Sequence, residues 1–217
     1  MRFHIGPPPQ NPDFQPELSG WTALREPRPI LLNLYGLPFS LVAAIVLSAA
    51  WGQGSSVSFE IAPATAGPSV LLLYLLLVLL VGFPAIIAVH ELIHGFGYPN
   101  LGFSRNTILA VWPSRLLFYA GYLGPMSRNR WLGVYLMPFL VLSVMPVAVC
   151  KTTGAYSGVA HLVSVFNGLL SGGDLFCVLL IWFQVPRTAI LQNQGWSTWW
   201  KIEPSSGQMD RQSADKG

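Results

Sequence analysis

The chain has 217 residues, of which 52% are hydrophobic and only 10% carry a charge. Soluble globular domains carry about a quarter charged residues, so this composition excludes an ordinary soluble protein and indicates a membrane protein of one domain. The formal net charge is +3, and the basic residues lie between apolar segments, which argues against nucleic-acid binding.

The N-terminal part of the chain leads into two predicted transmembrane helices. Residues 1–29 are polar and rich in proline, so they are predicted to form a flexible tail. Residues 30–51 are predicted to form the first transmembrane helix, because about twenty apolar residues suffice to cross a bilayer. A loop without lysine or arginine follows, and residues 69–96 are predicted to form the second transmembrane helix.

The second predicted transmembrane helix ends in the motif His90-Glu91-Leu-Ile-His94. Residues four apart lie on one face of a helix, so His90 and His94 can bind the same metal ion. Glu91 then reaches a water molecule at that ion and can act as a general base. The alternative is a structural pair of histidines at the membrane interface, although polar groups at the end of an apolar helix are costly unless they find partners.

The longest connection, residues 97–129, contains one apolar stretch that favours strands. This stretch, residues 108–119, is interrupted by Pro113 and Ser114, which is typical of a β-hairpin or a short re-entrant element. It is too short and too broken to form a further transmembrane helix.

Residues 130–150 and 156–183 are predicted to form the third and fourth transmembrane helices. The fourth helix carries a polar stripe, which should face the interior of a helix bundle. The stripe consists of Ser164, Asn167, Ser171 and Asp174. Residues 184–202 hold three tryptophans and are predicted to form an interfacial segment, and residues 203–217 are predicted to be a disordered tail. The expected fold is an all-α membrane protein with four transmembrane helices and a small β-hairpin or re-entrant element.

The distribution of lysine and arginine predicts the orientation in the membrane. Basic residues occur in the N-terminal tail, in the 97–129 connection and in the C-terminal part, whereas the other two loops carry only Lys151. By the positive-inside rule both termini are then cytosolic, and we expect an integral protein of the plasma (inner) membrane.

This orientation bears on the third metal ligand. The second and fourth predicted helices run in the same direction, so Asp174 lies at the depth of the two motif histidines. His161 lies roughly 20 Å from Asp174 along a helix, and it can join the same ion only if that helix is broken, for instance at Gly172-Gly173. We therefore expect Asp174 as the third ligand, with His161 as the alternative. The other role open to Asp174 is to pair with a basic loop residue. Two imidazoles, one carboxylate and an open fourth position fit one catalytic Zn²⁺.

The pattern resembles a known family. The His90-Glu91-x-x-His94 motif on the second helix, followed by Asn167 and Gly173-Asp174 on the fourth, resembles the small membrane proteins described as putative zincin peptidases. These are similar to site-2 proteases, the intramembrane zinc metalloproteases. The resemblance covers about residues 70 to 185. Site-2 proteases carry the third-ligand aspartate in a motif with Asn-Pro, whereas Asn167 is followed here by Gly168, which bears on the substrate class more than on the metal site.

The resemblance implies a membrane-embedded zinc metallopeptidase that acts on a peptide or membrane-protein substrate. Asn167 would hydrogen-bond the substrate or the oxyanion, with an ordinary helix–helix hydrogen bond as the alternative role. Residues 108–119 would present an edge strand to an extended substrate, or else form a lid that packs on the bundle. The lipid bilayer is the other expected partner.

Two further functions compete with the peptidase. A non-catalytic metal-binding scaffold or regulator would need no general base, and a structural zinc ion would need a fourth protein ligand, which the sequence does not offer. A transporter or channel would use the polar stripe as an ion path, but the chain shows no inverted repeat.

Overall fold

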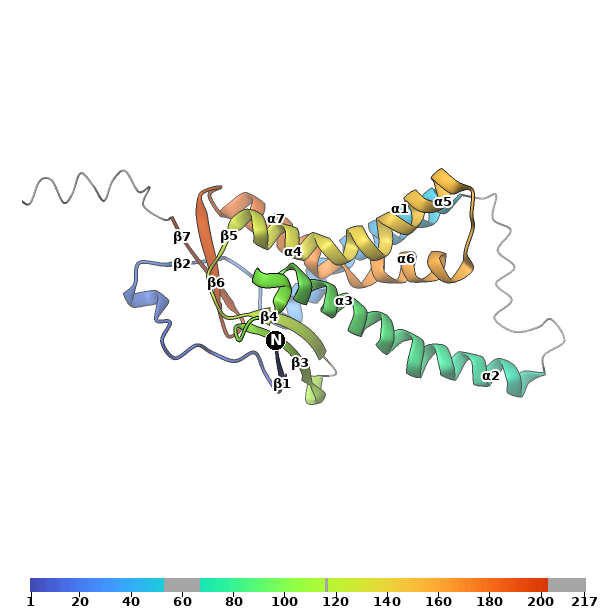
Figure 1. The fold of residues 1–217 in the computed structure, drawn as a ribbon, viewed down its shortest axis with the longest axis horizontal. Coiled ribbons are helices and arrows are strands. Elements are labelled where there is room, and N and C mark those ends of the chain that lie inside the picture. The colour runs from blue at the N-terminus through green and yellow to red at the C-terminus, as the bar shows by residue number, and fades with distance from the viewer. Residues whose placement is uncertain (53–66, 116, 203–217) are drawn as a thin grey trace, which may run out of the picture.

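The computed structural model describes residues 1–52, 67–115 and 117–202, which form a mostly helical protein with two small β-sheets (Figure 1). The expected all-α fold is therefore corrected in one respect, because strands make up a substantial part of the described chain. The disordered tail expected at residues 203–217 and most of the first loop lie outside the described residues.

Among the residues that the structure describes, three apolar helical stretches are long enough to cross a membrane. The first is α1 (Pro29–Trp51). The second joins α2 (Pro68–Leu77), the π-helical η2 (Val78–Gly82) and α3 (Phe83–Gly97). The third joins α4 (Arg128–Pro138), the π-helical η5 (Phe139–Val144) and α5 (Met145–Thr153). These bounds agree within a few residues with the first three predicted helices.

The fourth predicted helix is a bent pair in the structure. Helix α6 (Gly158–Leu170) and helix α7 (Gly172–Gln184) meet at an angle of 49°. The break occurs where α7 packs against α1, since a Cβ atom at Gly172 would collide with Ser40 and with the carbonyl of Gly36. The described residues thus contain three continuous candidate spans, and a fourth only if the bent pair crosses as one unit.

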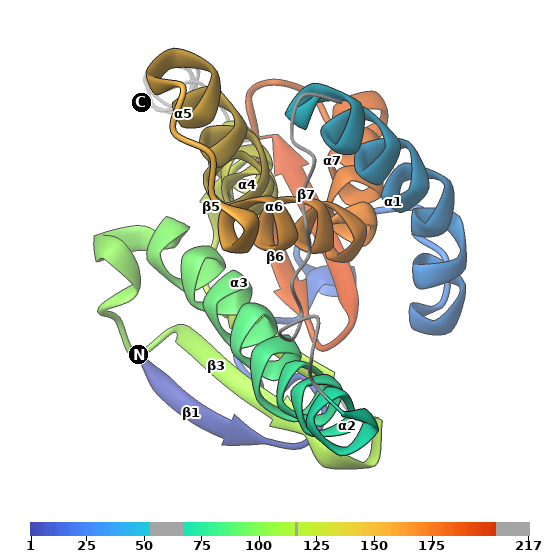
Figure 2. The ribbon, with the colours of Figure 1, turned by 90° about the vertical axis from the view of Figure 1, so that its right-hand side faces the viewer.

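The first sheet lies beside the end of α3. It contains β1 (Arg2–Ile5), β3 (Thr107–Trp112) and β4 (Leu117–Tyr122) in the order β1-β3-β4. Strands β3 and β4 are antiparallel and are joined by the short η4 (Pro113–Arg115), so residues 108–119 form the hairpin, one of the two alternatives expected there. Figure 2 shows α3 lying along the sheet beside β1 and β3. The strand order makes β4 an edge strand.

The second sheet joins segments that are far apart in the sequence. Its strands are β2 (Thr22–Ala23), β7 (Ser197–Ile202), β6 (Ala189–Gln194) and β5 (Met126–Ser127), in that order. Residues 184–202, expected to be an interfacial segment, therefore form mainly a β-hairpin. Residues 1–29 also differ from the expected flexible tail, because they contribute β1, β2 and the short η1 (Pro16–Leu18). Pairing with distant strands orders these residues, and such pairing leaves little local trace in the sequence.

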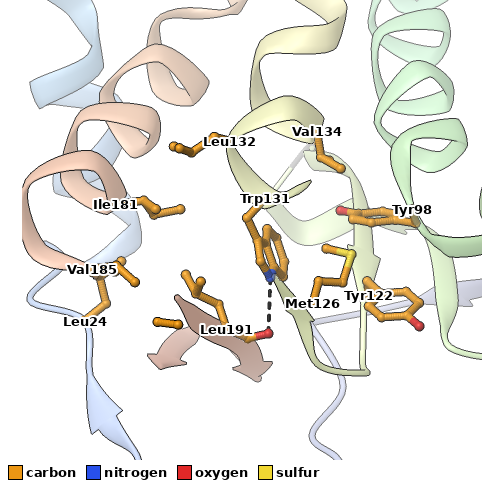
Figure 3. Packing of buried hydrophobic residues seen from close by; sticks show 11 residues of the cluster. Leu24, Tyr98, Tyr122, Met126, Trp131, Leu132, Val134, Ile181, Val185 and Leu191 are labelled. Carbon is orange, nitrogen blue, oxygen red and sulfur yellow. Dashed lines mark hydrogen bonds between the residues drawn. The ribbon is translucent and has the colours of Figure 1, made fainter. Parts of the chain in front are cut away.

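The main hydrophobic cluster lies where α4, α7 and the second sheet meet, next to the end of α3 (Figure 3). At its centre is Trp131, which is 1% exposed and whose Nε1 donates a hydrogen bond to the carbonyl of Leu191 at 3.2 Å. Tyr98 stacks on Tyr122 in the same cluster. The short η3 (Pro99–Gly102) continues the chain from α3 toward β3. The core thus fixes the position of the end of α3, which carries the metal motif.

Both sheets lie at one end of the helices (Figure 1). The end of α1, the start of α2 and the turn between α5 and α6 lie at the other end. This arrangement is the one that alternating membrane crossings produce, with residues 1–28, 98–127 and 185–202 gathered on one side.

Candidate metal centre

The two motif histidines lie on the buried face of α3. His90 is 5% exposed and His94 is 6% exposed, and the centroids of their rings are 4.8 Å apart. Asp174 lies in the first turn of α7, where the positive end of a helix dipole favours a carboxylate. The bend between α6 and α7 directs this first turn toward α3. The structure therefore brings together the three ligands that the sequence predicts.

The distances among the three ligand atoms suit a zinc ion. Asp174 Oδ2 lies 3.0 Å from His90 Nε2 and 3.3 Å from His94 Nε2, and the two Nε2 atoms are 3.1 Å apart. Zinc bonds of about 2.0–2.1 Å at tetrahedral angles place ligand atoms about 3.3 Å apart. Among the described residues, this is the group of histidine, cysteine and acidic side chains that can hold a metal ion. The donor set and the spacing both fit zinc.

Each histidine is oriented through its second ring nitrogen. His94 Nδ1 lies 2.9 Å from the carbonyl oxygen of Val134, which can only accept a hydrogen bond, so Nδ1 is the donor. His90 Nδ1 lies 2.8 Å from Asn167 Oδ1 and donates to it in the same way. Both rings then keep the lone pair of Nε2 for a metal ion, which is how backbone and side-chain partners commonly orient metal ligands.

Glu91 lies beside the three metal-ligand side chains and is hydrogen-bonded to the first sheet. Its Oε2 accepts a hydrogen bond from the backbone N–H of Ala120 on β4 at 2.7 Å. The carbonyl of Ala120 in turn accepts a hydrogen bond from the Tyr98 hydroxyl at 3.3 Å. In the part of the chain that the structure describes, no hydrogen bond reaches Glu91 Oε1. One oxygen of the carboxylate is thus fixed, and the other is available for proton transfer.

Asn167 lies behind His90 and is fully buried. Its Nδ2 donates to the carbonyl of Pro138 at 3.0 Å and to Ser143 Oγ at 2.9 Å, while its Oδ1 faces His90. The direct contact with substrate that the resemblance implies would require Asn167 to give up these bonds. Its observed position is that of a residue that orients a metal ligand.

His161, the alternative third ligand, lies far from this group despite the break in the helix. Its ring stacks on Trp51 with centroids 5.0 Å apart, and its Nδ1 lies 2.9 Å from the Tyr156 hydroxyl. The Trp51 side chain donates to Ser164 Oγ, so the start of the predicted polar stripe belongs to this second cluster. The geometry therefore favours Asp174 over His161.

The three ligands and Glu91 line a cleft of about 770 Å³ between the helices and the two sheets. The aromatic side chains of Trp112, Tyr119 and Trp196 form part of its wall. The ring centroids of Trp112 and Trp196 are 5.7 Å apart. The cleft is also lined by Glu26, which accepts hydrogen bonds from the backbone N–H and the hydroxyl of Thr198 at 2.6 and 3.1 Å. Burial raises the pKa of Glu26 to about 7, although these hydrogen bonds act in the opposite direction.

Several contributors to the cleft cannot be found from residue patterns. The Val134 acceptor is a backbone carbonyl, which every residue type has. Pro8, Pro9 and Glu26 line the cleft only because the N-terminal segment pairs with both sheets. Between residues 131 and 150 of the third apolar stretch, Ser143 is the one serine, threonine, amide or charged residue, and this isolation is the sequence feature that points to it.

Comparison with known proteins gives one match. Residues 83–190 match the family described as "Putative zincin peptidase", and this range contains the metal motif, the hairpin, Asn167 and Asp174. The chain has no significant match among the curated proteins or among the solved structures. The segment that matches is the one that holds the metal centre. Through residues 83–190, this chain belongs to the putative zincin peptidase family.

Proposed function

We propose that the protein is a membrane-embedded zinc metallopeptidase that hydrolyses a peptide bond with Glu91 as the general base. One observation carries the proposal: Nε2 of His90, Nε2 of His94 and Oδ2 of Asp174 converge within bonding range of one ion, with the Glu91 carboxylate beside them in the same cleft. A purely structural zinc site would call for a fourth protein ligand, and the described residues supply three.

His90, His94 and Asp174 would hold the zinc ion, which when bound acidifies water and polarises a carbonyl group. Glu91 accepts the proton of the attacking water at Oε1, while the N–H of Ala120 keeps Oε2 in place. Glu91 then passes this proton to the nitrogen of the leaving amine as the C–N bond breaks. Asn167 and the Val134 carbonyl hold the two imidazole rings, so that neither ring swings away during the reaction.

The edge of β4 is suited to an extended substrate. Strand β4 pairs with β3 on one side only, and the Ala120 N–H that bonds to Glu91 points away from β3. In an antiparallel strand the N–H and C=O of alternate residues share one side, so those of Phe118 point toward the cleft as well. Main-chain pairing with this edge would place a substrate bond next to Glu91 without selecting its side chains. A transmembrane substrate would have to unwind before it could pair in this way.

The positive-inside rule supports an orientation with both termini and the sheets in the cytosol. The zinc centre would then lie near the cytosolic end of the helices, where the cleft between the two sheets gives water access. The plasma (inner) membrane is the site that we propose.

The proposal is tested by separating metal binding from hydrolysis. The detergent-purified protein is incubated with a peptide library from a digested proteome and with a set of single-span membrane peptides, and new chain ends are identified by mass spectrometry. We expect wild type to hold about one zinc per chain and to cleave some of these peptides. Glu91→Gln should keep the zinc and lose activity by at least about 100-fold, because the general base is gone.

Glu17→Gln, at an exposed position of η1, serves as the matched control and should behave as wild type. Asp174→Ala should lose the zinc, whereas His161→Ala should retain it, since His161 lies in the Trp51 cluster. Cleavage by Glu91→Gln at the wild-type rate would contradict the proposed base. Zinc binding by wild type without any cleavage would instead favour the non-catalytic metal-binding scaffold.

A further inference from the structure

Helix α4 contains a proline at the point where it contacts the metal centre. In an α-helix, each backbone N–H donates to the carbonyl four residues earlier. Proline has no N–H, so Pro138 leaves the carbonyl of Val134 without its usual helical partner. That carbonyl accepts the hydrogen bond from His94 Nδ1 at 2.9 Å. Val134 is 2% exposed and Pro138 is fully buried, so the bond is shielded from bulk solvent.

The carbonyl of Pro138 is linked to the other histidine, His90, through the side chain of Asn167. It accepts from Asn167 Nδ2 at 3.0 Å, and Ser143 Oγ lies 2.9 Å from the same nitrogen. Because the amide nitrogen is engaged with these two acceptors, Asn167 Oδ1 is directed toward His90 Nδ1. One proline is therefore linked to both metal-binding rings, through the carbonyl it frees and through the carbonyl it carries.

We propose that Pro138 is a positioning residue of the metal centre, which acts by withholding one backbone N–H so that the Val134 carbonyl can orient His94. An alanine at this position would supply an N–H that competes for the same carbonyl. His94 would then lose the partner that fixes its tautomer and ring direction. Outer partners of metal ligands commonly change metal affinity by about 10- to 100-fold, and a loss in this range is the expected effect.

A second proline in the same long helix provides a matched control. Pro146, in α5, likewise has no N–H to offer the carbonyl four residues earlier, which is that of Leu142 in the π-helical η5. In the described part of the chain, no side chain donates a hydrogen bond to Leu142. Replacement of Pro146 by alanine therefore also supplies a backbone N–H within this long helix, but it leaves both histidines untouched.

The test measures zinc affinity, by competition with a chromophoric chelator, for the full chain in detergent. This readout rests on the metal centre of the proposed function and does not require hydrolysis. We expect Pro138→Ala to weaken zinc binding by about 10- to 100-fold, and Pro146→Ala to leave it within about twofold. A further variant carries lactic acid, the α-hydroxy analogue of alanine, at position 138. It has the side chain of alanine, but an ester oxygen replaces the N–H, so nothing competes for the Val134 carbonyl. This variant should restore the zinc affinity to within a few-fold of wild type.

A second replacement covers the case in which Pro138→Ala does not fold. The α-hydroxy analogue of tyrosine at position 135 turns the Val134 carbonyl into an ester carbonyl, which is a poorer acceptor, while Pro138 stays in place. Zinc affinity should fall several-fold. The spectrum of bound Co²⁺ should also change, because it reports the geometry of the ligands directly.

Three results would overturn the inference: Pro138→Ala binding zinc like wild type, both proline variants losing the same affinity, or a folded lactic acid variant that is not restored. In each case wild type still binds zinc, so the proposed metallopeptidase stands. A wild-type protein that binds no zinc overturns the inference together with the proposed function.

Discussion

At the scale of single residues, the metal centre depends on atoms whose role is set by their neighbours. His90 and His94 can coordinate a metal through Nε2 because Nδ1 of each ring donates to a fixed acceptor. Glu91 is a usable base because Ala120 holds only one of its two oxygens. The sequence predicts these three side chains from their spacing alone, but it does not predict the acceptors that orient them.

Glu26 gives a prediction about pH at this scale. Its pKa is raised by burial from 4.5 to about 7, so the folded protein keeps its proton over a range in which the unfolded chain has lost it. The stabilisation from the neutral carboxyl is complete below pH 4.5, declines as the pH rises toward 7, and is absent above that. Glu26→Gln stays neutral at all pH values and can still accept from Thr198. Its melting temperature relative to wild type should therefore rise between about pH 5 and pH 7.5, as measured by thermal unfolding in detergent. A constant difference between the two proteins over this range would show that Glu26 ionises normally.

At the scale of elements, the contact between α3 and α4 determines whether His94 reaches Val134. Gly97, at the end of α3, allows this approach, because a Cβ there would lie 2.9 Å from Val134 Cγ2 and 3.0 Å from Met137 Sδ. Helix propensity alone would favour alanine at such a position. The glycine thus reflects packing at the metal centre.

Gly97→Ala should lower stability by about 1–3 kcal/mol through overpacking, and it should weaken zinc binding because it moves α4 away from His94. Gly133→Ala is the matched control on α4, since nothing lies within 4 Å of a Cβ at that position. It should be neutral or slightly stabilising, by up to about 1 kcal/mol. Thermal unfolding with and without zinc measures both effects. Equal behaviour of the two variants would contradict the role of this contact.

The elements also differ in how well they could be predicted. The β3–β4 hairpin was predictable because its strands are adjacent in the sequence and a Pro-Ser turn separates them. The pairing of β1 with β3 and of β2 with β7 joins segments about 100 residues or more apart, and residues 1–29 were expected to be a flexible tail. The bend between α6 and α7 was anticipated only as a possibility at Gly172-Gly173, because the close packing of Gly172 against α1 is a tertiary contact.

At the scale of the whole molecule, the sheets and the metal cleft lie at one end of the helices, and the α5–α6 turn lies at the other (Figure 1). In sealed vesicles of known orientation, a membrane-impermeant maleimide should therefore label Leu18→Cys and Ala155→Cys from opposite sides. Both positions are exposed, and the variants are made with Cys150 and Cys177 replaced by alanine. Labelling of Leu18→Cys from the cytosolic side is the expected result. Labelling of both positions from the same side would refute the alternating topology.

The sequence by itself predicted the apolar helices and the His90-Glu91-x-x-His94 motif, and it favoured Asp174 as the third ligand while His161 stayed open as the alternative. Hydrophobic length, helical spacing and the positions of basic residues are local properties that can be read directly from the chain. Only the tertiary structure decided which nitrogen of each histidine faces the other metal-ligand atoms, how the N-terminal segment completes the cleft, and which side chain donates to the Val134 carbonyl. Those features depend on backbone carbonyls and on long-range strand pairing, which every residue type can provide and which therefore leave no mark in the order of the amino acids.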